Sequence, residues 1–165
     1  MPSPAATPDV SQKSDLSNAK IPGLFRRLGA ILYDSMLVTA VVFAAFALAY
    51  LPLAVGFGVV DINDTGQYKY LFFIYMLTVG VGFHIWFWTH GGQTLGMRTW
   101  SMKLFSEDGG TVSVRQAVVR YGVAVISLLA LGLGFLWSLF DKEKRSWHDM
   151  ASGTRLISVT KKRRH

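Results

Sequence analysis

Three long apolar segments, separated by polar ones, dominate the hydrophobicity pattern of this chain. The first runs from Leu28 to Val60 with a single charged residue, the second from about 69 to 89, and the third from about 117 to 140. A bilayer core takes about 20 helical residues, so each segment is long enough for a membrane helix. The pattern predicts an all-α membrane protein with two to four transmembrane or re-entrant helices.

The first apolar segment is longer than one span requires. Pro52 should end its helix near Leu51, because proline removes a backbone donor and disfavours a helical residue before it. We therefore place the spans at about 28–51, 69–89 and 117–140. Aromatic residues crowd both ends of the second span, as they do at the two membrane interfaces.

The third apolar segment has two possible topologies. One crossing would place the basic C-terminal residues on the side opposite Arg26 and Arg27, although Lys and Arg favour the cytoplasmic side. A break at the glycine-containing sequence 131–134 would instead give two short helices that enter the membrane and return. The charge pattern favours this re-entrant topology, with a cytoplasmic N-terminus and a cytoplasmic tail.

The polar segment between the second and third apolar segments predicts a small cytoplasmic β-hairpin. Residues 99–105 alternate between apolar and polar, Asp108 and Gly109 supply a turn, and residues 111–114 alternate again. Two strands alone are marginally stable in water. The hairpin should therefore rest on the membrane surface or on the polar tail.

The two ends of the chain differ from its middle. Residues 1–21 are polar and contain proline and serine, which predicts a disordered segment. Residues 161–165, Lys-Lys-Arg-Arg-His, form a basic tail suited to anionic lipids. Residues 22–160 would form one membrane domain. No short apolar core with a small-residue cleavage site comes early, so the first span should be an uncleaved anchor.

Composition agrees with a membrane location and narrows the chemistry. Hydrophobic residues make up 51% of the chain and charged residues 16%, against roughly 25% charged in soluble domains. The net charge of +7 comes from residues beside the apolar segments rather than from an aromatic-studded face, so we expect no nucleic-acid partner. The absence of cysteine excludes thiolate chemistry. No nucleophile–base spacing, metal cluster or cofactor fingerprint appears, so we expect neither an enzyme nor a cofactor.

Asp34 is the one charged residue inside the first span. An ionised carboxylate at the centre of a membrane helix costs roughly 2.5 to 3.5 kcal/mol on insertion scales. Arg27 lies seven residues earlier on nearly the same helix face, about 10 Å away along the axis, and should ease this cost without direct contact. Arg26 points elsewhere and suits a lipid headgroup. Asp34 could carry a proton or cation, or could pack against another helix.

A second charged group, Asp141, His148 and Asp149, follows the third apolar segment. Histidine titrates near neutral pH, so His148 and Asp149 could relay protons. Adjacent helical residues point about 100° apart, however. Asp149 could therefore instead cap or ion-pair within a short helix, with His148 at the membrane interface.

These motifs resemble the RDD family of bacterial membrane proteins, named for one arginine and two aspartates. Arg27 or Arg26 matches the arginine, Asp34 the first aspartate, and Asp149, in Trp-His-Asp-Met-Ala-Ser-Gly-Thr, the second. Gly-Gly-Gln-Thr-Leu-Gly-Met-Arg at 91–98 is also similar. The third apolar region is shorter than in many members of that family.

The resemblance implies a multi-pass protein of the bacterial inner membrane. It also implies a proposed transport role, with sodium–proton exchange among the suggested activities, although the family as a whole has no settled activity. Our first hypothesis is an oligomeric transporter of small ions or solutes. In it Asp34 binds a proton or cation, Arg27 tunes Asp34, and Asp149 with His148 guards the cytoplasmic mouth. The alternative is a non-catalytic scaffold or assembly partner whose buried charges fix helix packing. We expect contacts with the lipid bilayer, including anionic lipids, and with a second copy or another membrane protein.

Overall fold

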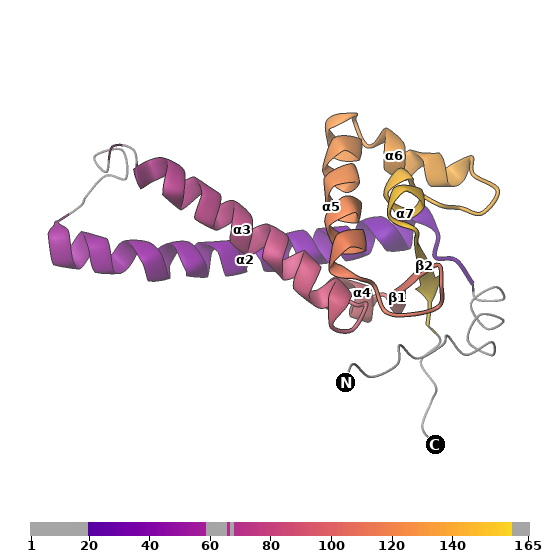
Figure 1. The fold of residues 1–165 in the computed structure, drawn as a ribbon, viewed down its shortest axis with the longest axis horizontal. Helices are drawn as coiled ribbons and strands as arrows, with labels where there is room; N and C mark the ends of the chain where they lie inside the picture. The colour runs from indigo at the N-terminus through magenta and orange to yellow at the C-terminus, as the bar shows by residue number, and fades with distance from the viewer. Residues whose placement is uncertain (1–19, 59–65, 67, 160–165) are drawn as a thin grey trace, which may run out of the picture.

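Two long apolar helices form the extended part of the molecule (Figure 1). The computed structural model describes residues 20–58, 66 and 68–159; the predictions for residues 1–19 and 161–165 lie outside them. Helix α2 spans Leu24–Phe57 and α3 spans Tyr68–Thr89. Both are long and apolar enough to cross a membrane, and almost no residue of their most apolar stretches is fully buried inside the protein. The prediction of a mainly α-helical membrane protein is confirmed.

Pro52 does not end the first helix, contrary to our prediction of an end near Leu51. Helix α2 continues through Pro52 to Phe57 and stops at Gly58, whose φ of 65° is one that glycine adopts readily. Proline costs a helix one hydrogen bond, whereas unwinding the helix in an apolar environment would leave many backbone groups unpaired. The continued helix is therefore the less costly conformation.

The third apolar segment is broken, close to the predicted position. Helix α5, Val114–Leu129, is followed by a turn and then by α6, Leu133–Leu136, and the 3-10 helix η2, Trp137–Leu139. The two parts meet at 107°. The turn contains Leu131 and Gly132, with φ of 55° and 78°. At 1.5 Å per residue, α5 alone is about 24 Å long, which is shorter than the hydrocarbon core of about 30 Å.

A small polar unit, which we call the cap, lies at one end of the α2–α3 pair. It consists of α4 (Leu95–Thr99), β1 (Met102–Ser106), α7 (Trp147–Ser152) and β2 (Thr154–Ser158). The chain before α2 joins the cap, because the Ser158 N–H donates to the Lys20 carbonyl at 2.8 Å.

The two strands of the cap pair in an antiparallel sheet, but the second strand is not the one we expected. Strand β1 lies in the alternating segment, and β2 pairs with it, with Leu104 opposite Leu156. Residues 111–113 lead into α5 instead. There the Ser113 side chain accepts from the Gln116 N–H, and the Gln116 side chain accepts from the Ser113 N–H. This capping box favours a helix start over a strand.

The apolar core joins the cap to the two long helices. Met102 and Leu104 of β1 are 0% and 1% exposed. They pack with side chains from α2, α3, α4, α5 and β2; the buried members are Ala30, Trp88, Met97, Met102, Leu104, Val112, Ala117 and Leu156. Burial of one large apolar side chain contributes about 1.5 to 3 kcal/mol, so this core seats the cap on the ends of the spans.

The pairing of β1 with β2 predicts a specific cross-link. Phe105 lies opposite Arg155, and facing residues of an antiparallel pair are about 4.5 to 5.5 Å apart between Cα atoms, within the range of a disulfide. The double variant Phe105→Cys/Arg155→Cys should therefore form an intramolecular disulfide on mild oxidation, measured by thiol titration and mass spectrometry.

The control is Phe105→Cys/Val159→Cys, since Val159 lies four residues beyond Arg155, about 14 Å at 3.4 Å per residue. Equal cross-linking of both pairs would contradict the register.

Candidate functional site

Three charged side chains from distant parts of the chain meet inside the protein. The Asp149 Oδ2 accepts from Arg27 Nη1 at 2.7 Å, and its Oδ1 accepts from Arg120 Nη1 at 2.6 Å. The two arginines are each 5% exposed and the aspartate 1%. One carboxylate of α7 thus ties the first turn of α2 to the middle of α5.

Arg27 uses most of its donors in this network. Besides Asp149, its Nη1 donates to the Ser146 hydroxyl at 2.7 Å, its Nη2 to the Lys144 carbonyl at 3.0 Å, and its Nε to the Pro22 carbonyl at 3.2 Å. The rigid guanidinium fork reaches acceptors in several directions at once, which a lysine ammonium does not reproduce. Arg27 therefore holds the chain before α2 and the chain before α7 together.

The local structure of α7 places the Asp149 carboxylate. Ser146 begins the helix, and both its N–H and its hydroxyl donate to Asp149 Oδ2, at 3.0 and 2.7 Å. On the other side, Arg120 Nη1 also donates to the Thr154 hydroxyl at 2.7 Å. Asp149 thus both caps α7 and forms ion pairs, which was one of the two alternatives for this residue.

The environment keeps Asp149 charged and His148 neutral. Burial alone would raise the pKa of Asp149, but the positive charges around it, chiefly that of Arg120, together with the Ser146 N–H hold it well below its usual range. Burial and then Arg120 lower the pKa of His148 to about 3. The neutral imidazole lies against the Phe135 ring, with centroids 4.8 Å apart, and its Nε2 is 3.1 Å from the Ser146 hydroxyl. A proton relay through this pair near neutral pH does not fit these charge states.

Asp34 forms a separate clamp. Its Oδ1 accepts from the Gly96 N–H at 2.9 Å, and its Oδ2 accepts from the Thr94 hydroxyl. Thr94 Oγ1 accepts from the Met97 N–H at 3.2 Å, so its own proton is free for Asp34. The carboxylate is 6% exposed, and it holds the start of α4 against α2.

Gly96 makes this clamp possible. A Cβ at this position would lie 2.4 Å from the Ala30 carbonyl oxygen and 2.9 Å from Asp34 Cγ. No larger residue fits without moving α4 away from α2. The Gly96 N–H is thus used within the protein, since it donates to the Asp34 carboxylate.

The remaining predicted residues have other roles in the structure. Arg26, expected at a lipid headgroup, donates to the Ser158 hydroxyl at 2.9 Å and to the Trp100 carbonyl. Asp141 accepts from the Arg145 N–H at 2.8 Å. Arg26 thus binds β2 of the cap, and Asp141 binds within the segment that leads into α7. Both residues lie outside the Asp149 network.

Arg120 is the residue that sequence reasoning missed. It is a lone charge three residues inside the predicted 117–140 span, which is the same signal that singled out Asp34. With it, the buried charges of the described residues balance, since Arg27 and Arg120 match Asp34 and Asp149 in number. The structure brings Arg27 and Asp149 together, and it binds Asp34 to Thr94 and Gly96.

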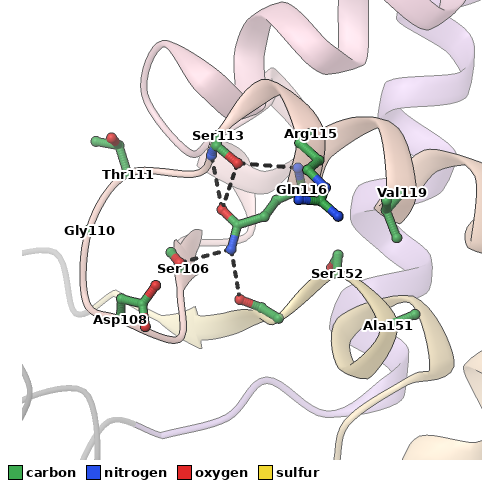
Figure 2. A pocket seen from close by; sticks show the side chains of 11 residues that line it. Ser106, Asp108, Gly110, Thr111, Ser113, Arg115, Gln116, Val119, Ala151 and Ser152 are labelled. Atoms are coloured by element: carbon green, nitrogen blue, oxygen red, sulfur yellow. Dashed lines mark hydrogen bonds between the residues drawn. The ribbon is translucent and has the colours of Figure 1, made fainter.

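A polar pocket of about 590 Å³ opens at the start of α5 (Figure 2). Gln116 reaches across it and donates to the Ser106 hydroxyl at 2.9 Å and to the Gly153 carbonyl at 3.2 Å. A second, apolar pocket of about 370 Å³ lies between α2 and α3, lined by residues that include Val38 and Met76. The lining of neither pocket includes Arg27, Asp34 or Asp149. Within the described ranges, no three His, Asp or Glu side chains gather as a metal site would require.

Comparison with known proteins agrees with the motifs. A model of the RDD family matches residues 21–153, which confirms the resemblance. The "Uncharacterized protein YxaI" of Bacillus subtilis (strain 168) is 34% identical over 64 residues, which cover 39% of this chain and 42% of that protein. The chain therefore spans less than half of that relative's length. No solved structure matches the chain.

The Asp149 network predicts a large stability loss on removal of the shared charge. Asp149→Asn leaves two buried arginines without their carboxylate, and breaking one side of a buried ion pair costs about 3 to 5 kcal/mol. We expect the free energy of unfolding in mild detergent to fall by about that amount. Asp108→Asn, a change of the same kind at an exposed loop residue, should stay within about 0.5 kcal/mol of wild type. Equal stability of the two variants would rule out a holding role for the network.

The neutral state of His148 predicts a pH dependence. Its folded pKa of about 3 lies below the ordinary value of 6.5, so between these values the unfolded chain binds the proton and the folded chain does not. The stability contribution is complete above about pH 6.5 and is lost as the pH falls towards 3. Thermal unfolding from pH 7 to 5 should therefore show a steeper loss for wild type than for His148→Gln. Parallel curves would contradict the buried neutral histidine.

Proposed function

The chain belongs to the RDD family, and on that premise we propose that it is a non-catalytic membrane scaffold whose buried charges fix a polar cap on a helical anchor. The observation that carries the proposal is the network of Arg27, Arg120 and Asp149, each 1% to 5% exposed, which joins α2, α5 and α7. Arg27 and Asp149 match two of the three residues that give the family its name, and the third, Asp34, joins α2 to α4.

The arrangement of donors and acceptors supports a structural role. Both oxygens of Asp149 and both oxygens of Asp34 accept hydrogen bonds from their own chain. Buried groups satisfied in this way rigidify a protein and specify one arrangement of its elements. In this function the cap is a fixed surface at the membrane that a protein partner binds.

The distribution of charge supports a cap on the cytoplasmic side of the bacterial inner membrane. Among the described residues, Lys69 is the one charged residue at the far end of the spans. At the cap end, Lys and Arg outnumber Asp and Glu, as the positive-inside rule requires of cytoplasmic segments. In this orientation the N-terminal segment is cytoplasmic, α2 and α3 cross the membrane, and β2 returns to the side where the chain began.

The anchor also supports an assembly role. Two helices bury little of each other, and large side chains such as Phe43 and Phe73 are 69% and 64% exposed. In the proposed function, these surfaces meet lipid and either a second copy of the chain or another membrane protein.

Transport of a small cation or solute, in exchange for protons, is the alternative function. A buried carboxylate on an apolar helix favours it, because such residues commonly mark ion pathways. In that function Asp34 would bind the ion, and Arg27 would set the affinity of Asp34 for it. The ion would then have to compete with the Thr94 hydroxyl and the Gly96 N–H for the carboxylate oxygens.

One experiment separates the two functions. Asp34→Asn and Gly96→Ala both damage the clamp, while Gly96→Ala keeps the carboxylate. For a scaffold, both variants should lower the free energy of unfolding by about 1 to 3 kcal/mol. Proteoliposomes of the wild type should show no cation-dependent proton flux above that of empty vesicles.

The matched control is Gly122→Ala, where an added Cβ meets no atom within 4 Å; it should be as stable as wild type or more so. Flux in the wild type that Gly96→Ala retains and a stable Asp34→Asn abolishes would overturn the scaffold proposal and establish transport.

A further inference from the structure

A bent apolar segment, residues 125–140, projects from the cap; we call it the elbow. No charged residue occurs between 121 and 140. Leu131 at its turn is 91% exposed and Phe140 at its end 81%. The other large exposed side chains are Val125, Ile126, Leu128, Leu129, Leu133, Leu136, Trp137 and Leu139. Soluble surfaces rarely carry an apolar patch of this kind, so the elbow requires an apolar environment.

Both ends of the elbow are attached to the cap. Before it, Gln116 of α5 donates to the Gly153 carbonyl, and Arg120 of α5 donates to Asp149. After it, the chain returns in α7, which packs against both α5 and α6. In Figure 1, α5 starts beside β1 and α4 and runs away from the sheet, and the chain then turns back towards α7. The elbow therefore leaves the cap and comes back to it.

Tight packing fixes the bend. Gly134 of α6 lies so close to α5 that an added Cβ would be 2.3 Å from Ser127 Oγ and 3.0 Å from the Trp147 ring. Ser127 is fully buried there. Since α5 is too short to cross a bilayer alone, a crossing would require this contact to open and the 107° angle to straighten.

A basic edge follows the elbow. Glu143 pairs with Arg155 and Arg145, and Asp141 pairs with Arg145. Lys142 and Lys144 are exposed, and in the described part of the chain neither ammonium group has an acidic partner. Two free cations directly beside an apolar wedge match the phosphate groups above the acyl chains of an anionic membrane.

We propose that the elbow inserts into the cytoplasmic leaflet without crossing the membrane, with Lys142 and Lys144 on the phosphate groups of anionic lipids. This inference rests on the orientation given under the proposed function. It assigns to the elbow a lipid partner, with acyl chains against Leu131 and Phe140.

The chain contains no cysteine, so single cysteines report position cleanly. Spin labels at Leu131→Cys and Phe140→Cys, in vesicles containing anionic phosphatidylglycerol, should be accessible to oxygen and shielded from a water-soluble nickel complex. A label at Asp108→Cys should show the reverse. An impermeant thiol reagent should reach Asp108→Cys and Val159→Cys from the same side.

Two results would overturn the proposal. Labelling of residues 108 and 159 from opposite sides would mean that the segment crosses the membrane. A nickel-accessible label at Leu131, or shielding accompanied by spin–spin broadening that vanishes on dilution with unlabelled protein, would mean that water or a second copy covers the elbow. Neither result bears on flux or on clamp stability, so the scaffold proposal is tested separately.

The lysines have their own test. Replacing neutral lipid by phosphatidylglycerol in nanodiscs should raise the Tm of the wild type more than that of Lys142→Gln/Lys144→Gln. Lys20→Gln, at an exposed residue on another part of the cap end, should respond as wild type does. Equal responses of all three proteins would remove the anionic-lipid contact.

Discussion

The Asp149 carboxylate is the group on which the arrangement of this protein depends. It is a single acceptor site, yet it receives donors from α2, from α5 and from the start of its own helix. Low polarity around it strengthens each bond and makes each unpaired partner costly. A buried ion pair adds little net stability over a well-packed apolar pair, but the loss of one partner is expensive. The main effect of the network is therefore to specify which helices pack together. Its contribution to the free energy of folding is smaller.

The two aspartates attach different parts of the chain to α2. Asp34 holds α4, which follows the second span, and Arg27, two turns earlier on the same helix, holds α7 through Asp149. Helix α2 is thus a spine to which the later parts of the chain are attached in turn. The contact between α2 and α4 requires a residue without a Cβ, which accounts for glycine at position 96. The contacts of Arg27 require several donors in a fixed fork, which accounts for arginine at position 27.

The features that depend on neighbouring residues in the chain could be predicted from the sequence. Apolar length placed the spans, the glycines of 131–134 placed the break, and a lone buried charge marked Asp34. Pro52 was misleading because the surrounding apolar medium penalises unwinding more than one lost bond. The partner of β1 was predicted wrongly, since residues 111–114 alternate whereas the true partner, residues 154–158, does not. The Ser113 capping box instead starts a helix at the end of the alternating segment. The partners of Asp34 and Asp149 lie 60 or more residues away in the chain, except for Arg120 and Ser146, and only packing selects them.

The position of β2 and α7 late in the chain has a consequence for biogenesis. Helices α2 and α3 can enter the membrane during synthesis, as domains form in order from the N-terminus. Arg27 and Arg120, however, have no carboxylate to meet until Asp149 has left the ribosome, and β1 presents an open edge until residue 158 follows. An unfinished chain thus carries two arginines without their carboxylate and a strand edge that can pair with another chain, and both are removed once residues 149–158 have been made.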